Sequence, residues 1–395
     1  RQRNATISNI HRSFSWQITE PLRLAGYLIR GDLKKAAASF KQIKISIVER
    51  LQEIPKFLLV LVKKAKSTES KSNNYALEAI VDERCRYTKN QPVLDPLTSE
   101  PPANLPCIDI SAVTYNSAKW IEGFVDSLLH LEYPKDLLTI HFVDNSSEDA
   151  TIDKIELAVE KLKAAGCIVL IHHCKNIGYG AGHNVAIREG SAPYCLITNV
   201  DLVFDPKALL NVVATAVADD EEAAAWELRQ RPFEHPKFYD PVTGLTNWNS
   251  HACILFRRSI LESVGCYDET LFMYGEDVEL SYRLRRSGAL LRYCPRAVVE
   301  HYSYDHVDQV KPLQYKGSTF ANLYLRLKYG NADDIWSIPF LAAQLILAPS
   351  PFPKARWMTI QNLCQLTIAA PKALWSRNKP IGESVNFPFR TWDYD

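Results

Sequence analysis

The sequence predicts an α/β fold with three layers, in which helices cover both faces of a mostly parallel β-sheet. The first observation is a set of β-rich runs at residues 108–114, 138–143, 167–172 and 194–198. The second is that segments with a helical spacing of apolar residues separate these runs, at residues 120–131, 152–165 and 181–189. Strands joined by single helices form parallel βαβ units, and such units place helices on the faces of a sheet.

The composition divides the 395 residues into four regions. Apolar residues keep a helical spacing over residues 1–66, which predicts a basic helical region. A stretch rich in serine, lysine and asparagine, followed by prolines, predicts a linker over residues 67–105. The alternating strands and helices define a domain at residues 106–305, and further helical runs predict a C-terminal helical region at residues 306–395.

The net charge of +1 conceals an uneven distribution. Residues 1–66 carry 14 Lys/Arg against four Asp/Glu, residues 306–395 carry ten against six, and residues 67–305 carry 22 against 35. A basic arm favours an anionic surface, either membrane lipid or nucleic acid, although solvated helix faces explain it equally well. The acidic centre argues against nucleic acid as a partner of the core.

The cysteines and the apolar stretches predict a cytoplasmic protein. Nine cysteines are scattered without a C-x-x-C pair, which indicates reduced thiols. The longest apolar stretches, residues 57–62 and 336–348, are shorter than the roughly 20 residues that a spanning helix needs. The sequence does not begin with methionine, which is compatible with a piece of a longer protein.

Short polar side chains follow three of the expected strands. Thr114, Tyr115 and Asn116 end the first strand, Asp144 and Asn145 end the second, and the segment from Asn199 to Asp201 follows the fourth. Any one set fits a turn. Ligands of parallel sheets bind at the carboxyl ends of the strands, so the three sets together predict a nucleotide pocket. Neither a G-x-G-x-x-G after the first strand nor a P-loop is present, which disfavours dinucleotide oxidoreductases and P-loop enzymes.

A glycine-rich turn follows the third expected strand. It contains Asn176, Gly178, Gly180 and Gly182, and a helix follows. Glycines let the backbone approach a ligand closely, and a helix N-terminus favours a diphosphate. The turn alone is a weak signal, but it lies at the same sheet edge as the polar residues.

Five motifs occur in order along the chain: V-T-Y-N at 113–116, F-V-D-N-S-S at 142–147, N-I-G-Y-G-A-G at 176–182, N-V-D at 199–201 and G-E-D-V-E-L at 275–280. Together they resemble the family-two glycosyltransferases of the GT-A fold, and in particular the bacterial rhamnosyltransferase-like branch. The resemblance covers about residues 106–305. Residues 13–23 are also similar to segments that precede such domains in multi-domain bacterial glycan-assembly enzymes.

The resemblance implies a divalent cation that stabilises the leaving diphosphate. The family usually supplies D-x-D ligands, whereas this chain has Asn199 in the first position and Asp201 as the remaining carboxylate, as in members of the rhamnosyltransferase-like branch. A further ligand is therefore expected, and His301 stands where the family places a metal-binding histidine. Imidazole ligation favours Mn²⁺ over Mg²⁺. The alternative for a lone histidine is a structural role.

The resemblance also implies the roles of the remaining site residues. Thr114 and Asp144 contact the base and ribose, and Tyr115 packs on the base or lies in the core. Asp277 removes the proton from the acceptor hydroxyl, with support from Glu276, and a single base of this kind gives inversion through an oxocarbenium-like transition state. Acids at the start of a helix also suit its dipole without any catalytic role.

The acceptor site is less defined by the sequence. Trp226, Trp248 and Asn249 lie between the metal motif and the base, and aromatic and amide groups suit sugars, although each tryptophan fits a core position equally well. Aromatic and basic residues mix in the C-terminal region, as at a membrane interface that holds a lipid-linked acceptor. A helical subdomain packed on the catalytic core explains them equally well.

The resemblance therefore implies an inverting transferase that moves a sugar to a bacterial polysaccharide or lipid-linked glycan, with rhamnose from dTDP-rhamnose as the leading donor. The expected location is the cytoplasmic side of the bacterial membrane, with peripheral contact to anionic lipid. Alternatives are a UDP-hexose or galactofuranose transferase, and an inactive glycan-binding or scaffold module motivated by Asn199. A nucleotidyltransferase needs a basic loop after the first strand, and residues 114–118 have none.

Overall fold

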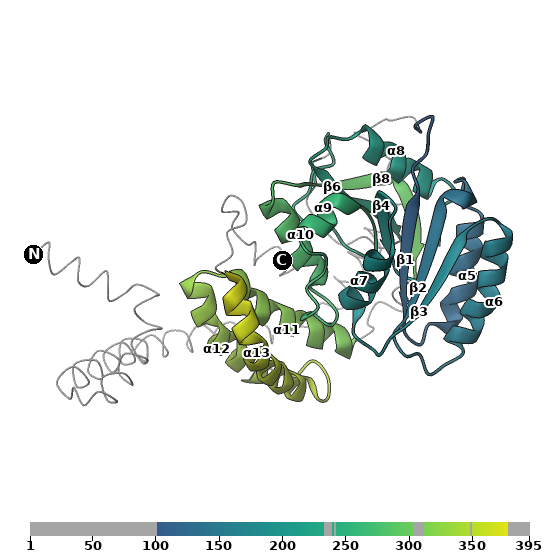
Figure 1. Cartoon of the computed structure of the whole chain (residues 1–395). Helices are drawn as coiled ribbons and strands as arrows, with labels where there is room; N and C mark the ends of the chain where they lie inside the picture. The colour runs from purple at the N-terminus through teal and green to yellow at the C-terminus, as the bar shows by residue number, and fades with distance from the viewer. Residues whose placement is uncertain (1–100, 233–238, 241, 303–310, 348–349, 378–395) are drawn as a thin grey trace, which may run out of the picture. The chain divides into compact units, whose positions relative to one another are not determined.

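A computed structural model of the chain describes residues 101–232, 239–240, 242–302, 311–347 and 350–377, all within one compact unit (Figure 1). The expected basic helical region at residues 1–66 and nearly all of the expected linker at residues 67–105 lie outside the described residues. The boundaries of these two regions therefore stay predictions.

The first half of the sheet has the four parallel strands that the sequence predicts. They are β1 (Ile108–Thr114), β2 (Leu138–Asp144), β3 (Ile168–His173) and β4 (Tyr194–Thr198), in the spatial order β3-β2-β1-β4. The helices α5 (Ala118–Leu129), α6 (Thr151–Ala164) and α7 (Tyr179–Glu189) join them, and a short 3₁₀ helix η1 (Lys135–Leu137) precedes β2. Thr114 pairs with Asp144 at the carboxyl ends of β1 and β2, so the two side chains start from the same edge.

The second half of the sheet is mixed. The order continues from β4 through β7 (Cys253–Arg257), β6 (Ala223–Arg231) and β8 (Leu290–His301) to β5 (Leu202–Phe204). β7 is antiparallel to both β4 and β6, β6 and β8 are parallel, and β5 is antiparallel to β8. The carboxyl ends of β6 and β8 therefore reach the same edge as those of β1, β2 and β4.

Helices cover both faces of this sheet, which confirms the predicted three-layer α/β architecture (Figure 1). α5, α6 and α8 (Ala208–Ala218) pack on one face, and α7, α9 (Arg258–Ser263) and α10 (Glu276–Arg286) pack on the other. Side chains alternate between two apolar cores along each central strand, because successive residues of a strand point to opposite faces. On β4, Leu196 lies in the first core, and Cys195 and Ile197 lie in the second.

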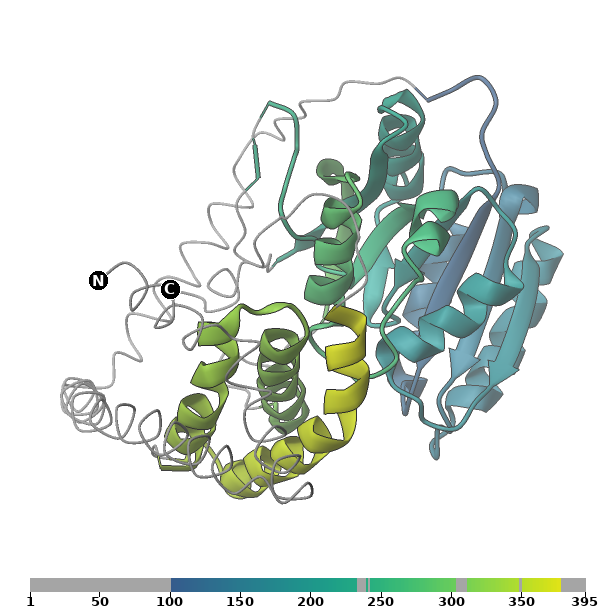
Figure 2. The same cartoon turned by 60° about the vertical axis from the view of Figure 1, so that its left-hand side comes forward.

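Three helices follow the sheet: α11 (Pro312–Tyr329), α12 (Ala332–Leu347) and α13 (Ala355–Arg377). α11 and α13 lie side by side (Figure 2). They build a third apolar core in which Phe320, Tyr324 and Leu366 meet Leu271 and Tyr282, which come from the preceding part of the chain. The helical nature predicted for this region is confirmed for its described residues. No helix of the described ranges is both long and apolar enough to cross a membrane.

Candidate active site

Asp144 ends β2 in a tight network of hydrogen bonds. Its Oδ1 accepts hydrogen bonds from Thr114 Oγ1 at 2.9 Å and Ser147 Oγ at 2.6 Å, and its Oδ2 accepts one from the Ser147 N–H at 2.9 Å. The Asp144 residue is only 3% exposed. The structure thus brings together Thr114 and Asp144, as the sequence predicts, and adds Ser147 as the group that orients the carboxylate.

The turn after β1 presents Tyr115 at the surface. Asn116 adopts a left-handed φ of 50°, and its side chain joins this turn to the loop after β2, where Oδ1 accepts the Glu148 N–H at 2.8 Å. Tyr115 is 50% exposed, so the alternative that it is a core aromatic is wrong. Its ring is therefore available to a ligand at the sheet edge.

The glycine-rich turn lies between the two halves of the site. Asn145 Nδ2 donates to the Gly178 carbonyl at 3.0 Å, and Asn145 Oδ1 is buried with no hydrogen-bond partner among the described residues. A Cβ on Gly178 would lie 2.2 Å from the Phe272 carbonyl oxygen, and Gly178 has a φ of 96°. A Cβ on Gly182 would lie 2.9 Å from Val113 Cγ2. Only glycine fits at these two positions. Gly180 is buried in the first turn of α7, and Asn176 is exposed at the start of the loop.

Asp201 and His301 are brought together by the pairing of β5 with β8, in which Leu202 lies opposite His301. Asp201 Oδ1 and His301 Nε2 are 3.4 Å apart, and the Asp201 side chain is 25% exposed. Burial raises the pKa of Asp201, but His301 outweighs it and the net pKa lies below the usual range. Asn199 precedes this pair and is half-buried, and its N–H donates to the Ala252 carbonyl at 2.8 Å.

Gln230 orients His301. The Gln230 side chain comes from β6 and is buried, and its Oε1 lies 2.7 Å from His301 Nδ1. An amide oxygen accepts, so His301 carries a proton on Nδ1, and in the neutral ring Nε2 has a lone pair on the side that faces Asp201. Two acceptors that face each other form a ligand pair for a cation, and a histidine with its other ring nitrogen anchored is typical of metal sites. Among the described residues, no group of three or more His, Cys, Asp or Glu side chains could hold a metal ion.

Glu276 and Asp277 are the first two residues of α10, as predicted. Two successive residues with positive φ, Tyr274 at 68° and Gly275 at 91°, turn the chain into the helix. Glu276 is 6% exposed, and its Oε2 has no hydrogen-bond partner in the described part of the chain. Asp277 Oδ1 accepts the Val278 N–H at 2.8 Å.

Burial shifts both acids, and the charge of Asp277 adds to the shift of Glu276. Burial, and then the charge of Asp277, raises the pKa of Glu276 to about 8. Burial also raises the pKa of Asp277 to about 6, with a further rise from the charge of Glu227, while hydrogen bonds from the Val278 N–H and the Trp248 side chain oppose the rise. The pair therefore holds one proton at neutral pH, on Glu276, and Asp277 is the ionised member.

The charges of these acids also act on Tyr179. Its hydroxyl donates to the His251 carbonyl at 2.7 Å. Burial raises its pKa well above the usual value, and the charges of Glu276, Asp201 and Asp277 raise it further. Three acidic side chains, two from the start of α10 and one from the residue before β5, thus act on one phenol.

β6 supplies two polar residues that the sequence did not reveal, Gln230 and Glu227. Glu227 is 2% exposed and accepts the Ser250 N–H at 2.8 Å and Asn249 Nδ2 at 3.3 Å. Residues 223–225 are all alanine, which has low β-propensity, so the strand was not recognised. The alternation of Trp226, Leu228 and Gln230 with Glu227 and Arg229 is the signal that could have revealed it.

The structure corrects the prediction of an acceptor-binding role for two of the three residues, Trp226 and Asn249. Trp226 is fully buried in the first apolar core, where its Nε1 donates to Asp219 Oδ2 at 2.8 Å. Asn249 is fully buried as well, and its amide binds Glu227 and the Arg292 carbonyl. Both residues therefore have a structural role inside the fold. Trp248 alone is partly exposed, next to Asp277.

The comparison with known families agrees with this arrangement. Residues 110–278 match the family model described as glycosyl transferase family 2, a span from β1 into the first turn of α10. The protein is thus a glycosyltransferase. Its residues 110–278 form a glycosyl transferase family 2 domain, and the proteins that the chain resembles include a bacterial rhamnosyltransferase.

Two relatives from Mycobacterium tuberculosis illustrate the similarity. An N-acetylglucosaminyl-diphospho-decaprenol L-rhamnosyltransferase is 28% identical over 49% of this chain and 76% of that protein. A pre-mycofactocin glycosyltransferase is 47% identical over 36% of this chain and 33% of that protein. Among solved structures, a mannosyltransferase from Pyrobaculum calidifontis in complex with GDP-Man and Mn²⁺ is 20% identical, with a TM-score of 0.49 over 80% of this chain and 93% of that chain.

Proposed function

We propose that the protein is an inverting glycosyltransferase that moves rhamnose from dTDP-rhamnose to a hydroxyl of a bacterial polysaccharide or lipid-linked glycan. The observation that carries the proposal is Asp277, an ionised, partly exposed carboxylate beside a protonated Glu276. The rhamnosyl donor is supported by the relative named as a decaprenol-linked rhamnosyltransferase.

Asp277 acts as the general base in this mechanism. It accepts the proton of the acceptor hydroxyl, and the hydroxyl oxygen forms the new bond to the anomeric carbon. The bond from that carbon to the diphosphate oxygen breaks at the same time, and its electron pair leaves with the diphosphate. A single displacement of this kind inverts the anomeric centre. A pKa of about 6 keeps Asp277 ionised at neutral pH and gives it more basicity than an ordinary aspartate.

A divalent cation, Mn²⁺ or Mg²⁺, would bind between Asp201 and His301. The facing acceptors fit such an ion, and the Nε2 ligand favours Mn²⁺. The ion would supply positive charge to the leaving diphosphate. Asp201 and His301 are two ligands only, so donor oxygens and water would complete the coordination.

The nucleotide would bind at the ends of β1 and β2. Asp144 and Thr114 would contact ribose and base, and the exposed ring of Tyr115 would pack on the base. Asn145 Oδ1 is a buried acceptor available to the donor. The first turn of α7, which contains Gly180, would receive the diphosphate.

We also propose that α13 docks on the anionic inner face of the bacterial membrane, where a lipid-linked acceptor is located. Trp357, Ile368 and Trp375 are 59%, 82% and 75% exposed, and their helical positions place them on one face. Residues 350–377 contain four basic residues and no acidic one. Exposed tryptophans on a helix of one charge sign are typical of an interfacial helix.

A donor screen tests the function. Transfer and donor hydrolysis are measured with dTDP-rhamnose, UDP-glucose, UDP-galactofuranose and GDP-mannose, with Mn²⁺, Mg²⁺ or EDTA. We expect dTDP-rhamnose and Mn²⁺ to give the highest rate, which falls as the pH drops through about 6, because Asp277 must be ionised. A preference for a UDP-sugar contradicts the donor, and no binding of any donor supports an inactive scaffold.

The variant Asp277→Asn tests the base. We expect kcat to fall about 10²–10⁴-fold with little change in donor KM. The matched control Asp126→Asn changes an exposed aspartate of α5 and should keep the full rate. Unchanged transfer in Asp277→Asn would show that another group is the base.

A further inference from the structure

Helix α11 contacts the backbone that leads into the catalytic helix. A Cβ on Gly317 would lie 2.1 Å from the Met273 carbonyl oxygen and 3.0 Å from a ring carbon of Tyr274. The next residues, Tyr274 and Gly275, have the two positive φ angles that turn the chain into α10. α11 therefore supports a strained turn directly from outside, and it belongs to a part of the chain that follows the matched residues 110–278.

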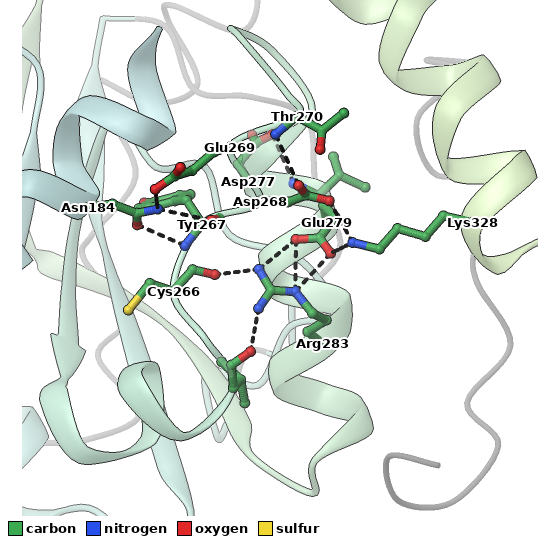
Figure 3. Close-up of polar contacts among 12 residues, drawn as sticks. Asn184, Cys266, Tyr267, Asp268, Glu269, Thr270, Asp277, Glu279, Arg283 and Lys328 are labelled. Carbon is green, nitrogen blue, oxygen red and sulfur yellow. Dashed lines mark hydrogen bonds and ion pairs between the residues drawn. The ribbon is translucent and has the colours of Figure 1, made fainter. Parts of the chain in front are cut away.

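A buried ion network joins the other end of α11 to the same region (Figure 3). Lys328 Nζ lies 2.7 Å from both Asp268 Oδ2 and Glu279 Oε1. Arg283 holds Glu279 from the opposite side, with Nε 2.8 Å from Oε1 and Nη2 2.7 Å from Oε2. The four side chains are at most 10% exposed.

The network holds two carboxylates and three cations, because Lys372 of α13 also reaches Asp268, with Nζ 3.3 Å from Oδ1. Burial raises the pKa of Asp268, but Lys328 outweighs it and holds the pKa well below the usual range. Burial likewise raises the pKa of Glu279, and Arg283 and Lys328 lower it on balance. Removal of Lys328 would leave the buried Asp268 paired with Lys372, whose side chain is 64% exposed, in place of a buried ammonium group at 2.7 Å. This loss favours a shift of Asp268 or of α10.

Glu279 connects this network to the base. It lies in the first turn of α10, two residues after Asp277, and its N–H donates to the Gly275 carbonyl at 3.0 Å. Tyr324 adds a hydrogen bond from α11 to Asp268 at 2.7 Å. The turn and the first helical residues that carry Asp277 are thus held from α11 by Gly317 at one end and by Lys328 and Tyr329 at the other.

We propose that Lys328 and Gly317 are positioning residues for Asp277, so that the catalytic unit includes α11 and does not end with the family-two domain. This inference rests on the proposed role of Asp277 as the base. The two residues act through the backbone of Tyr274–Asp277. The alternative is that they only stabilise the fold.

The variant Lys328→Met tests the proposal by hydrogen–deuterium exchange and by kinetics. We expect exchange to rise about tenfold in peptides covering residues 272–280 and to stay unchanged in peptides covering residues 138–147 of the donor side. With dTDP-rhamnose, kcat should fall about 10²-fold, the cost of a displacement near 1 Å, while donor KM changes less than about threefold. The control Lys161→Met removes an exposed lysine 3.9 Å from a carboxylate on α5 and should change neither quantity.

The variant Gly317→Ala tests the contact between α11 and the turn at Met273. It also provides a test of the proposal if Lys328→Met does not fold. The new methyl group must displace the Met273 carbonyl, so the same peptides should exchange faster and kcat should fall with donor KM maintained. The control is Gly123→Ala on α5, where a Cβ would meet only Val203 Cγ2 at 4.0 Å. It should keep the exchange and the rate of the unchanged protein.

The outcomes separate the possibilities. Faster exchange across the whole sheet, with the same kcat per folded molecule, would show a purely structural role and overturn the proposal. Unchanged exchange at residues 272–280 in both variants would also overturn it. If the wild-type protein turns over none of the donors, the proposed function is wrong. The exchange experiment would still show whether α11 stabilises the turn at residues 272–280.

Discussion

Substitution of Glu276 by glutamine should change how the stability of the protein depends on pH. Glu276 is 6% exposed, and its pKa is raised from 4.5 to about 8 by burial and the charge of Asp277. A carboxyl group with a raised pKa binds its proton more tightly in the folded protein, so its favourable contribution is present at low pH and is lost as the pH rises towards 8. Glutamine keeps the shape and cannot ionise.

The magnitude follows from the shift. Above pH 4.5 the unfolded Glu276 is ionised while the folded one keeps its proton until about pH 8, so stability falls by about 1.4 kcal/mol per pH unit in between. Between pH 6 and pH 8 the wild-type chain should lose about 2 kcal/mol relative to Glu276→Gln. For a chain of this size, that loss lowers Tm by roughly 4 °C.

The assay is thermal unfolding followed by circular dichroism at pH 6 and pH 8. The Tm of Glu276→Gln minus the Tm of the wild-type chain should be larger at pH 8 by roughly 4 °C. The control Glu160→Gln changes a glutamate whose side chain is 80% exposed and should give the same difference at both pH values. An equal difference for Glu276→Gln at the two pH values would refute a buried, protonated Glu276.

Three further predictions concern the donor site, the cation and the membrane. Gln230→Leu removes the 2.7 Å partner of His301 and should weaken Mn²⁺ binding about 10–100-fold by calorimetry, and an unchanged affinity would refute His301 as a ligand. Gly182→Ala places a methyl group 2.9 Å from Val113 Cγ2 and should raise donor KM with a smaller change in kcat, and the reverse pattern would contradict the donor assignment. Trp375→Ser removes a 75% exposed side chain and should weaken binding to phosphatidylglycerol vesicles about tenfold, whereas equal binding to neutral phosphatidylcholine vesicles would refute an anionic docking surface.

The sequence predicted the parallel half of the fold because its signals are local. The apolar run Ile108–Thr114 forms β1, and the acidic start at Glu276 begins α10 where expected. Polar residues at the ends of parallel strands converge by topology alone, so Thr114 and Asp144 could be placed together without coordinates. The pairing of Asp201 with His301 came from the resemblance to a family.

What the sequence did not predict depends on contacts between distant segments. From the sequence alone, a tryptophan in an apolar core cannot be distinguished from a tryptophan at a sugar site. Only the burial of the Trp226 ring decides between these two positions. Gln230 reaches His301 through the parallel pairing of β6 and β8. The network of Lys328 joins residues 49 and 60 positions apart, and no periodicity reveals such a pair.

The two peptide carbonyls of Phe272 and Met273 are each closely approached by a glycine from a different part of the chain. Gly178 of the glycine-rich turn contacts the first carbonyl, and Gly317 of α11 contacts the second. The Phe272 side chain itself is 40% exposed. A saturation mutagenesis library should therefore reject every substitution at the two glycines and accept many at Phe272, although none of the three performs chemistry. The substitutions that the protein tolerates at these positions would then depend on how closely two backbone segments approach each other. Two of the most restricted positions would be residues with no catalytic role.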